Sequence, residues 1–341
     1  MFFREILGQE WVISHLKTAR QKGRLSHAYL FLGPEGVGKA STAQALAAAL
    51  NCQTPMEDGD ACGTCASCRR LAAGTHPDFL VISPTPEALQ KLQPQIKIEQ
   101  IREFRRLTAY PPFSGGWRVA LIKPAEAMND AAANALLKTL EEPPDRHLII
   151  LTAQVEADLL PTVVSRCHKL AFAPLPAALV AGELERRRGL APSLAQLLAA
   201  LSGGSLGRAL TLNPEAILAQ RRRVLADLGA LATGSAAAAL DWAQRLAKSR
   251  PDLDHFLLLA QMWYRDLLLC HFQAPAALLA HQDLAAELAH DAAATPTAAL
   301  FHQFTALGAA QRHLQANLNP ELTLDILGLR LQRRGQVHAP R

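Results

Sequence analysis

Residues 33–40 read Gly-Pro-Glu-Gly-Val-Gly-Lys-Ala and fit the phosphate-loop pattern Gly-x4-Gly-Lys-Ser/Thr at every position except the last. They follow a short apolar run and precede an alanine-rich helical stretch, which is the context that such a loop needs. Glycines let backbone N–H groups close around phosphate oxygens, and a lysine adds a point charge. The residues expected in these roles are Gly33, Gly36, Gly38 and Lys39.

Hydrolysis needs more than this loop. The last loop position should carry a hydroxyl for magnesium, but it is Ala40, and Ser41 comes one residue too late. A carboxylate pair should follow the third strand, yet the two places, counted back from the next helix, fall on Pro124 and Ala125. Glu126 is expected to be a solvated loop residue. We therefore predict no hydrolysis by this chain alone, while ATP binding stays open.

Four cysteines form the pattern Cys-x9-Cys-x2-Cys-x2-Cys at Cys52, Cys62, Cys65 and Cys68. Four thiolates suit a closed tetrahedral zinc site, and spacings of two residues let successive sulfurs converge on one ion. An iron–sulfur site and free thiols are the alternatives, although no Cys-Pro follows as iron–sulfur patterns require. We predict a structural zinc ion, because the four thiolates leave no open coordination position.

Arg166 lies in a Ser-Arg-Cys stretch between the fourth and fifth predicted strands. A guanidinium in such a connection can stabilise the charge that develops on a neighbouring subunit's γ-phosphate during phosphoryl transfer. It can do so while its own subunit is inactive. Spacing alone does not separate this role from that of an ordinary surface charge.

Alternating strands and helices are predicted over residues 1–174. The five expected strands are 28–32, 78–82, 118–122, 148–152 and 169–172. A helix at 10–22 precedes them, and the helices between them include 41–50, 98–108 and 130–142. Strands separated by helices indicate parallel crossovers, so we predict an α/β class with a parallel sheet.

The composition changes at residues 174–176, Pro-Leu-Pro, and helical periodicity alone follows. We predict three domains: 1–174 with a cysteine insert at 52–68, a small helical domain at 175–213, and an all-helical domain at 214–341. The last helix, after Asn319-Pro320, places Leu322, Ile326 and Leu329 on one face, and Leu324, Leu327 and Leu331 widen this apolar stripe.

The 341 residues are half hydrophobic, which permits sizeable cores, and the formal net charge is +5. That charge is compatible with a nucleic-acid partner but does not establish one. The chain shows no secretory signal at its start and no convincing membrane span, so we predict a cytoplasmic protein with unpaired cysteines. Cys167 and Cys270 are expected to be plain buried residues.

Taken in order, these features resemble the bacterial DNA polymerase III clamp-loader subunits of the AAA+ class. The resemblance has specific motifs over residues 1 to about 210. They are the phosphate loop, the cysteine insert, 134–144 (Asn-Ala-Leu-Leu-Lys-Thr-Leu-Glu-Glu-Pro-Pro), Ser-Arg-Cys at 165–167, and the stretches 7–10 and 27–31.

The resemblance implies a RecA-like AAA+ domain, a helical lid and a helical collar. The collar would join gamma/tau and delta subunits and this chain in a hetero-pentamer that loads a sliding clamp onto primed DNA, as part of a DNA-directed DNA polymerase holoenzyme. Ala40, Pro124 and Ala125 favour the non-hydrolysing delta-prime type. Arg166 then carries the arginine-finger role in trans, and the four cysteines carry zinc. Arg208 follows the Gly-Ser-Leu turn of the lid, one place later than the nucleotide-sensing arginine of active members.

Two alternatives remain open. One is an active, gamma/tau-like AAA+ clamp-loader ATPase with an unusual magnesium site. The other is a zinc-dependent nucleic-acid-binding module on a relic ATPase fold. For DNA contact within the complex, the candidates are Arg102, Arg105 and Arg106 on one predicted helix, although a solvated helix face explains them equally simply.

Overall fold

The computed structural model describes residues 2–89 and 94–332, which divide into two compact units. The first unit runs to Leu179 and includes Gly204–Arg208. The second consists of Val180–Gly203 and the chain from Ala209 onward. The expected boundary at residue 213 and the prediction of a separate lid remain predictions.

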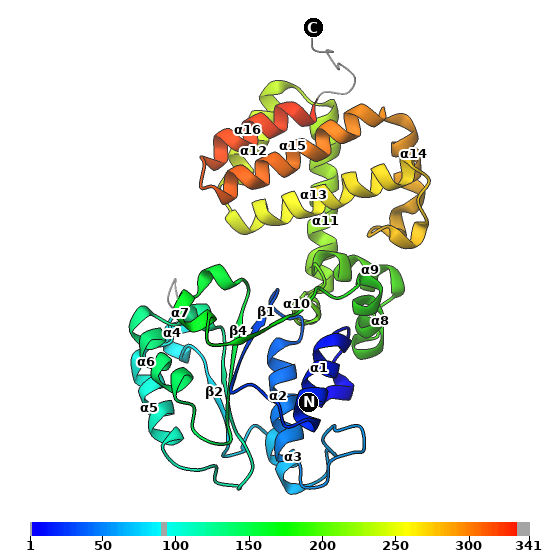
Figure 1. The fold of residues 1–341 in the computed structure, drawn as a ribbon. Coiled ribbons are helices and arrows are strands. Elements are labelled where there is room, and N and C mark those ends of the chain that lie inside the picture. The colour runs from blue at the N-terminus through cyan, green and yellow to red at the C-terminus, as the bar shows by residue number, and fades with distance from the viewer. Residues whose placement is uncertain (1, 90–93, 333–341) are drawn as a thin grey trace. The chain divides into compact units, whose positions relative to one another are not determined.

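The first unit contains a five-stranded parallel sheet in the order β2-β3-β4-β1-β5, as the alternation of strands and helices predicted (Figure 1). Each strand lies within two residues of its predicted bounds. The strands are β1 Ala28–Leu32, β2 Phe79–Ile82, β3 Arg118–Ile122, β4 His147–Ala153 and β5 His168–Ala171.

Helices cover both faces of this sheet (Figure 1). Successive residues of β4 alternate between the two resulting cores, because side chains along a strand point to opposite faces: Leu148 and Ile150 join one core, Ile149 and Leu151 the other. The helical elements are η1 Phe3–Glu5, α1 Glu10–Gln21, α2 Lys39–Asn51, α3 Ala66–Ala72, α4 Pro86–Leu89, α5 Ile98–Thr108, η2 Ala125–Ala127, α6 Asp130–Glu141, η3 Glu156–Asp158 and α7 Pro161–Val164.

Helix α2 begins at Lys39, two residues before its predicted start. The N–H groups in the first turn of a helix have no acceptor within the helix, so the glycine-rich loop, which ends at Gly38, can pass directly into it. Helix α6 has a conventional beginning, because the side chain of Asn129 accepts a hydrogen bond from the Ala132 N–H. It ends at Glu141, just before Pro143 and Pro144.

After Ala171 the described residues contain helices and no strand, as predicted. The elements are α8 Ala177–Arg188, α9 Pro192–Leu201, α10 Leu206–Thr211, α11 Pro214–Thr233, α12 Ala236–Ala247, α13 Arg250–His271, η4 Ala276–Leu278, η5 Gln282–Leu284, α14 Ala285–Ala294, α15 Thr297–Gln315 and α16 Pro320–Leu331. Across residues 2–89 and 94–332, none of the helices combines the length and the apolar character that crossing a membrane requires.

Two of these helices begin with the same local device. Asn213 and Asn319 each accept two backbone N–H groups with the side-chain oxygen, and proline occupies the next position. Proline suits the first helical position because its missing N–H is not needed there. The predicted apolar face of α16 exists, but Leu322, Ile326 and Leu329 are exposed while Leu324, Leu327 and Leu331 are buried.

Candidate functional site

The phosphate loop joins the end of β1 to the start of α2 and has a tightly constrained backbone. Gly33 has φ 140°, and a Cβ atom there would lie 2.3 Å from the carbonyl oxygen of Phe172. Gly36 has φ 75°, and a Cβ atom there would lie 2.2 Å from Ser205 Oγ. Such distances exclude any side chain, so both glycines are required by the fold itself.

A segment distant in sequence lies against this loop within the same unit. The N–H of Gly207 donates to the carbonyl oxygen of Gly36 at 2.9 Å, and a Cβ atom on Gly207 would meet Gly36 Cα at 2.9 Å. Gly207 occupies the place directly after the Gly-Ser-Leu turn. Its lack of a side chain is what allows the two backbones to touch, which leaves no room at this position for an arginine.

Lys39 folds back onto the loop that carries it. Its ammonium group donates to the carbonyl oxygens of Gly33 and of Pro34, the latter at 2.7 Å. Burial lowers the pKa of Lys39, and the negative charges of Glu126 and Glu35 oppose that effect.

The positions where an active phosphate-loop enzyme carries its magnesium-binding groups hold other residues, as the sequence predicted. Ala40 occupies the first turn of α2, and Pro124 and Ala125 follow the end of β3. The expectation for Glu126 was wrong: its Oε2 atom is buried without a hydrogen-bond partner, and its charge acts on Lys39. The short helix η2 turns the chain after β3 and leaves the Glu126 side chain half-buried.

The four cysteines of the insert come together as predicted. Their sulfur atoms all lie within 4.8 Å of one another, with Cys62 and Cys68 separated by 3.9 Å and Cys68 and Cys52 by 3.7 Å. A tetrahedral zinc ion with bonds of about 2.3 Å requires sulfur–sulfur distances of about 3.8 Å. The spacing therefore fits a four-thiolate metal site.

Backbone N–H groups point at these sulfurs. Cys62 Sγ accepts from the N–H groups of Thr64 at 3.4 Å and Cys65 at 3.3 Å, and Cys52 Sγ accepts from the Cys62 N–H at 3.3 Å. A hydrogen bond from the Thr54 side chain and those two backbone donors lower the pKa of Cys62 to about 5. The thiolate, which is the form that binds metal, is thus favoured at Cys62, whereas burial raises the pKa of Cys52 and of Cys68.

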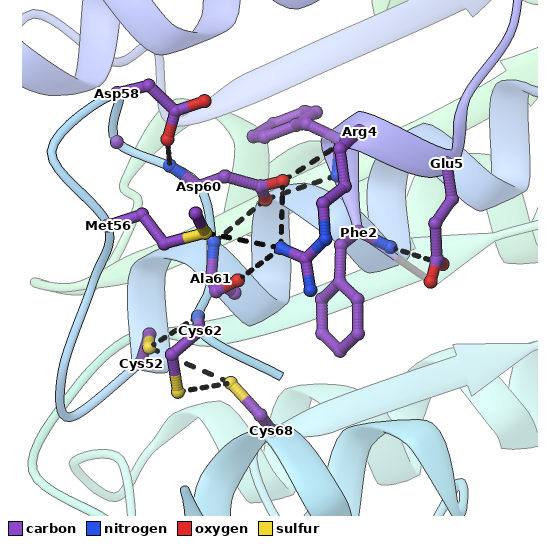
Figure 2. Close-up of polar contacts among 12 residues, drawn as sticks. Phe2, Arg4, Glu5, Cys52, Met56, Asp58, Asp60, Ala61, Cys62 and Cys68 are labelled. Carbon is purple, nitrogen blue, oxygen red and sulfur yellow. Dashed lines mark hydrogen bonds and ion pairs between the residues drawn. The ribbon is translucent and has the colours of Figure 1, made fainter. Parts of the chain in front are cut away.

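The cysteine insert is tied to the amino-terminal segment through Asp60 (Figure 2). Its carboxylate accepts the N–H of Phe3 and the N–H of Arg4, both at 3.1 Å, and the Arg4 guanidinium also donates to the Ala61 carbonyl at 2.7 Å. A few residues later, the Gln9 side chain donates to the carbonyl of Val37 in the phosphate loop at 3.3 Å. The sequence did not predict that the amino-terminal segment contacts both the cysteine insert and the phosphate loop.

Arg166 lies just after α7 and remains partly exposed. Its Nη1 donates to the Thr162 carbonyl at 2.8 Å, and its Nη2 pairs with Glu141 Oε1 at 2.7 Å. The three arginines considered for DNA contact lie on α5, as predicted. Arg102 and Arg106 are exposed, and Arg106 pairs with Glu103 at 2.8 Å. No feature of these side chains in the structure identifies a nucleic-acid ligand.

The parallel sheet, the phosphate loop after β1 and the helical remainder define a phosphate-loop module of the AAA+ class. The profile of the family described as "DNA polymerase III, delta subunit" matches residues 8–176, and that described as "DNA polymerase III, delta subunit, C terminal" matches residues 215–332. The chain belongs to this family of DNA polymerase III subunits.

Individual relatives agree with this assignment. DNA polymerase III subunit delta' of Pseudomonas aeruginosa is 43% identical over 205 residues, which are 59% of this chain and 60% of that protein. DNA polymerase III subunit tau of Escherichia coli is 36% identical over 221 residues, which are 63% of this chain and 33% of that protein. The chain therefore spans less than two thirds of either relative.

Solved structures show weaker likeness. A gamma subunit-related protein of DNA polymerase III from Thermotoga maritima has a TM-score of 0.38 at 19% identity, with 93% of this chain and 99% of that chain covered. The Holliday junction branch migration motor RuvB from the same organism has a TM-score of 0.42 at 17% identity, with 66% and 65% covered.

Proposed function

We propose that this chain is a delta-prime-type subunit of a DNA polymerase III clamp loader that does not hydrolyse ATP itself. The observation that carries the proposal is a combined loss: Ala40, Pro124 and Ala125 stand where an active subunit needs a hydroxyl and two carboxylates. Methyl and pyrrolidine groups neither bind magnesium nor polarise a water molecule.

The covered phosphate loop supports the same proposal. Gly207 contacts the backbone of Gly36, and Lys39 donates to carbonyl oxygens of its own loop. A nucleotide phosphate would have to compete with these contacts for the same lysine. The chain keeps the ancestral loop as a structural element, and nucleotide bound here would not be turned over.

Arg166 supplies the chemistry that this chain contributes to its partners. In the proposed complex its guanidinium lies against the γ-phosphate of ATP bound to a neighbouring gamma/tau subunit and stabilises the charge that develops there. The partial exposure of Arg166 supports this role, because a residue that acts on a neighbour must reach beyond its own fold.

The remaining assignments follow from the same family. Residues 175–213 act as the lid, and residues 214–341 form the collar that joins gamma/tau and delta subunits in a hetero-pentamer. The complex places a sliding clamp on primed DNA. Cys52, Cys62, Cys65 and Cys68 hold a zinc ion that cross-links the insert and performs no chemistry, since four thiolates fill a tetrahedral ion.

The test of the non-hydrolytic proposal uses the purified full-length chain with ATP and magnesium. We expect phosphate release at the background rate. Addition of gamma/tau and delta subunits should restore turnover that depends on primed DNA and clamp. Brisk magnesium-dependent hydrolysis by the isolated chain would instead favour an active gamma/tau-like ATPase.

A further inference from the structure

Two oxygen atoms from different helices accept hydrogen bonds from the terminal nitrogens of the Arg166 guanidinium. Nη1 donates to the carbonyl oxygen of Thr162 in α7, and Nη2 pairs with the carboxylate of Glu141 at the end of α6. Because the group is planar and its N–H bonds form a fixed fork, two bonded nitrogens define its orientation.

Glu141 is well placed to hold this group. It is the last residue of α6, and the same helix buries Leu136 and Leu140 in the core, so the backbone that carries the carboxylate is fixed. Helices α6 and α7 also pack against each other, which fixes the distance between the two residues.

This ion pair has little value for folding. The Arg166 side chain is 36% exposed and that of Glu141 is 50% exposed, and pairs with such access to water contribute little to stability. A guanidinium has five N–H donors, and the contacts to Thr162, to Glu141 and to Ser165 Oγ, which lies 3.5 Å from Nη1, use at most three of them. The other donors remain to bind a phosphate group.

We propose that Glu141 is a positioning residue for Arg166. It holds the guanidinium in the orientation required at the neighbour's γ-phosphate before that phosphate arrives, and so removes part of the ordering cost from the reaction. The inference rests on the proposed arginine-finger role and identifies Glu141 as the residue that orients this arginine.

The experiment measures ATP turnover of the reconstituted complex with variants of this chain. Glu141→Ala should lower kcat about three- to tenfold and leave the KM for ATP unchanged, because ATP is held by the neighbouring subunit. Glu141→Gln should restore most of the rate, since its amide oxygen can still accept the Nη2 hydrogen bond.

Two matched controls separate positioning from loss of a surface charge. Glu142→Ala removes the next carboxylate along the chain. Glu156→Gln breaks the ion pair with Lys169, which has the same 2.7 Å length and similar exposure. Both should leave turnover unchanged, and gel filtration should show equal assembly for every variant.

The double variant with Arg166→Ala gives the decisive comparison. Once Arg166 is absent, Glu141→Ala should cause no further slowing. The positioning role would be overturned if Glu141→Ala slowed turnover equally with and without Arg166, or if it had no effect while Arg166 is present. Either result would leave the finger role intact. An unchanged rate for Arg166→Ala alone would overturn the finger role and this inference together.

Discussion

The carboxylate of Asp60 accepts the backbone N–H of Arg4 at 3.1 Å and pairs with the Arg4 guanidinium at 3.3 Å (Figure 2). The Asp60 side chain is buried, whereas the Arg4 side chain is 42% exposed, so these contacts are shielded from water on the Asp60 side. They fasten the amino-terminal segment to the loop between Cys52 and Cys62. The cysteine cluster and the segment that leads to the phosphate loop are thereby parts of one structure.

Replacement of Asp60 by Ala should destabilise both the amino-terminal segment and the cysteine insert. The N–H groups of Phe3 and Arg4 lose their acceptor, and a buried donor left unpaired costs about 1–3 kcal/mol. We expect a lower free energy of unfolding and faster loss of zinc to a chelator. Glu57→Gln, an exposed change in the same loop, is the control. If Asp60→Ala had the same unfolding free energy and the same rate of zinc loss as Glu57→Gln, Asp60 would not hold these two segments together.

Metal content tests the cysteine cluster directly. Elemental analysis should find about one zinc ion per chain in the wild-type protein, and Cys62→Ser or Cys65→Ser should lose it. Cys270→Ser should retain full zinc content, because Cys270 is not in the cluster. Iron in place of zinc, or zinc retained by both cluster variants, would refute the assignment.

Asp78 predicts a dependence of stability on pH. Burial would raise the pKa of Asp78, but the N–H groups of Ser114 and Phe113 and the Arg118 guanidinium outweigh it and lower the pKa below the ordinary value. A lowered pKa stabilises the fold above the unfolded-state pKa of about 4, and this stabilisation is lost as the pH falls through the folded-state value.

The Asp78→Asn variant should therefore be less stable than wild type by about 3 kcal/mol at pH 7, since the buried Arg118 guanidinium loses its carboxylate partner and keeps only backbone carbonyl acceptors. The difference should shrink below about pH 4. Urea titrations at several pH values measure it, with Asp145→Asn, a change at an exposed carboxylate, as the control. A difference that stays constant down to pH 2 would argue against the ion pair as its source.

Restoration of one missing group should not restore hydrolysis. Ala40→Thr supplies the magnesium hydroxyl, but Pro124 and Ala125 still provide no carboxylate. We expect phosphate release by the isolated variant to stay at background, as for wild type. Substantial turnover by Ala40→Thr would show that Glu126 or another group replaces the missing carboxylates.

Much of this architecture was predictable from the sequence. The strands of the sheet are short apolar runs between glycines, prolines and helices, and the prediction for β3 matched its observed bounds. The closeness of Cys62, Cys65 and Cys68 followed from their spacing of three residues, whereas the approach of Cys52, ten residues before Cys62, depends on the path of the intervening loop.

The rest depends on contacts between distant residues. Glu126 is four residues beyond the end of β3 and reads as a loop residue, yet it lies in η2, which packs against β4. The contact between Gly36 and Gly207, and the pair between Glu141 and Arg166, join elements that are separate in sequence. No local pattern encodes such approaches.

The most direct measurement is the ATP turnover of the reconstituted clamp loader containing Arg166→Ala. Assembly should be normal, because Arg166 is partly exposed and contributes little to its own fold. Turnover at the adjoining gamma/tau site should fall on the order of a thousandfold relative to that same site with wild-type chain. Turnover that remained unchanged at that site would contradict the claim that this chain contributes an arginine to a neighbour's reaction.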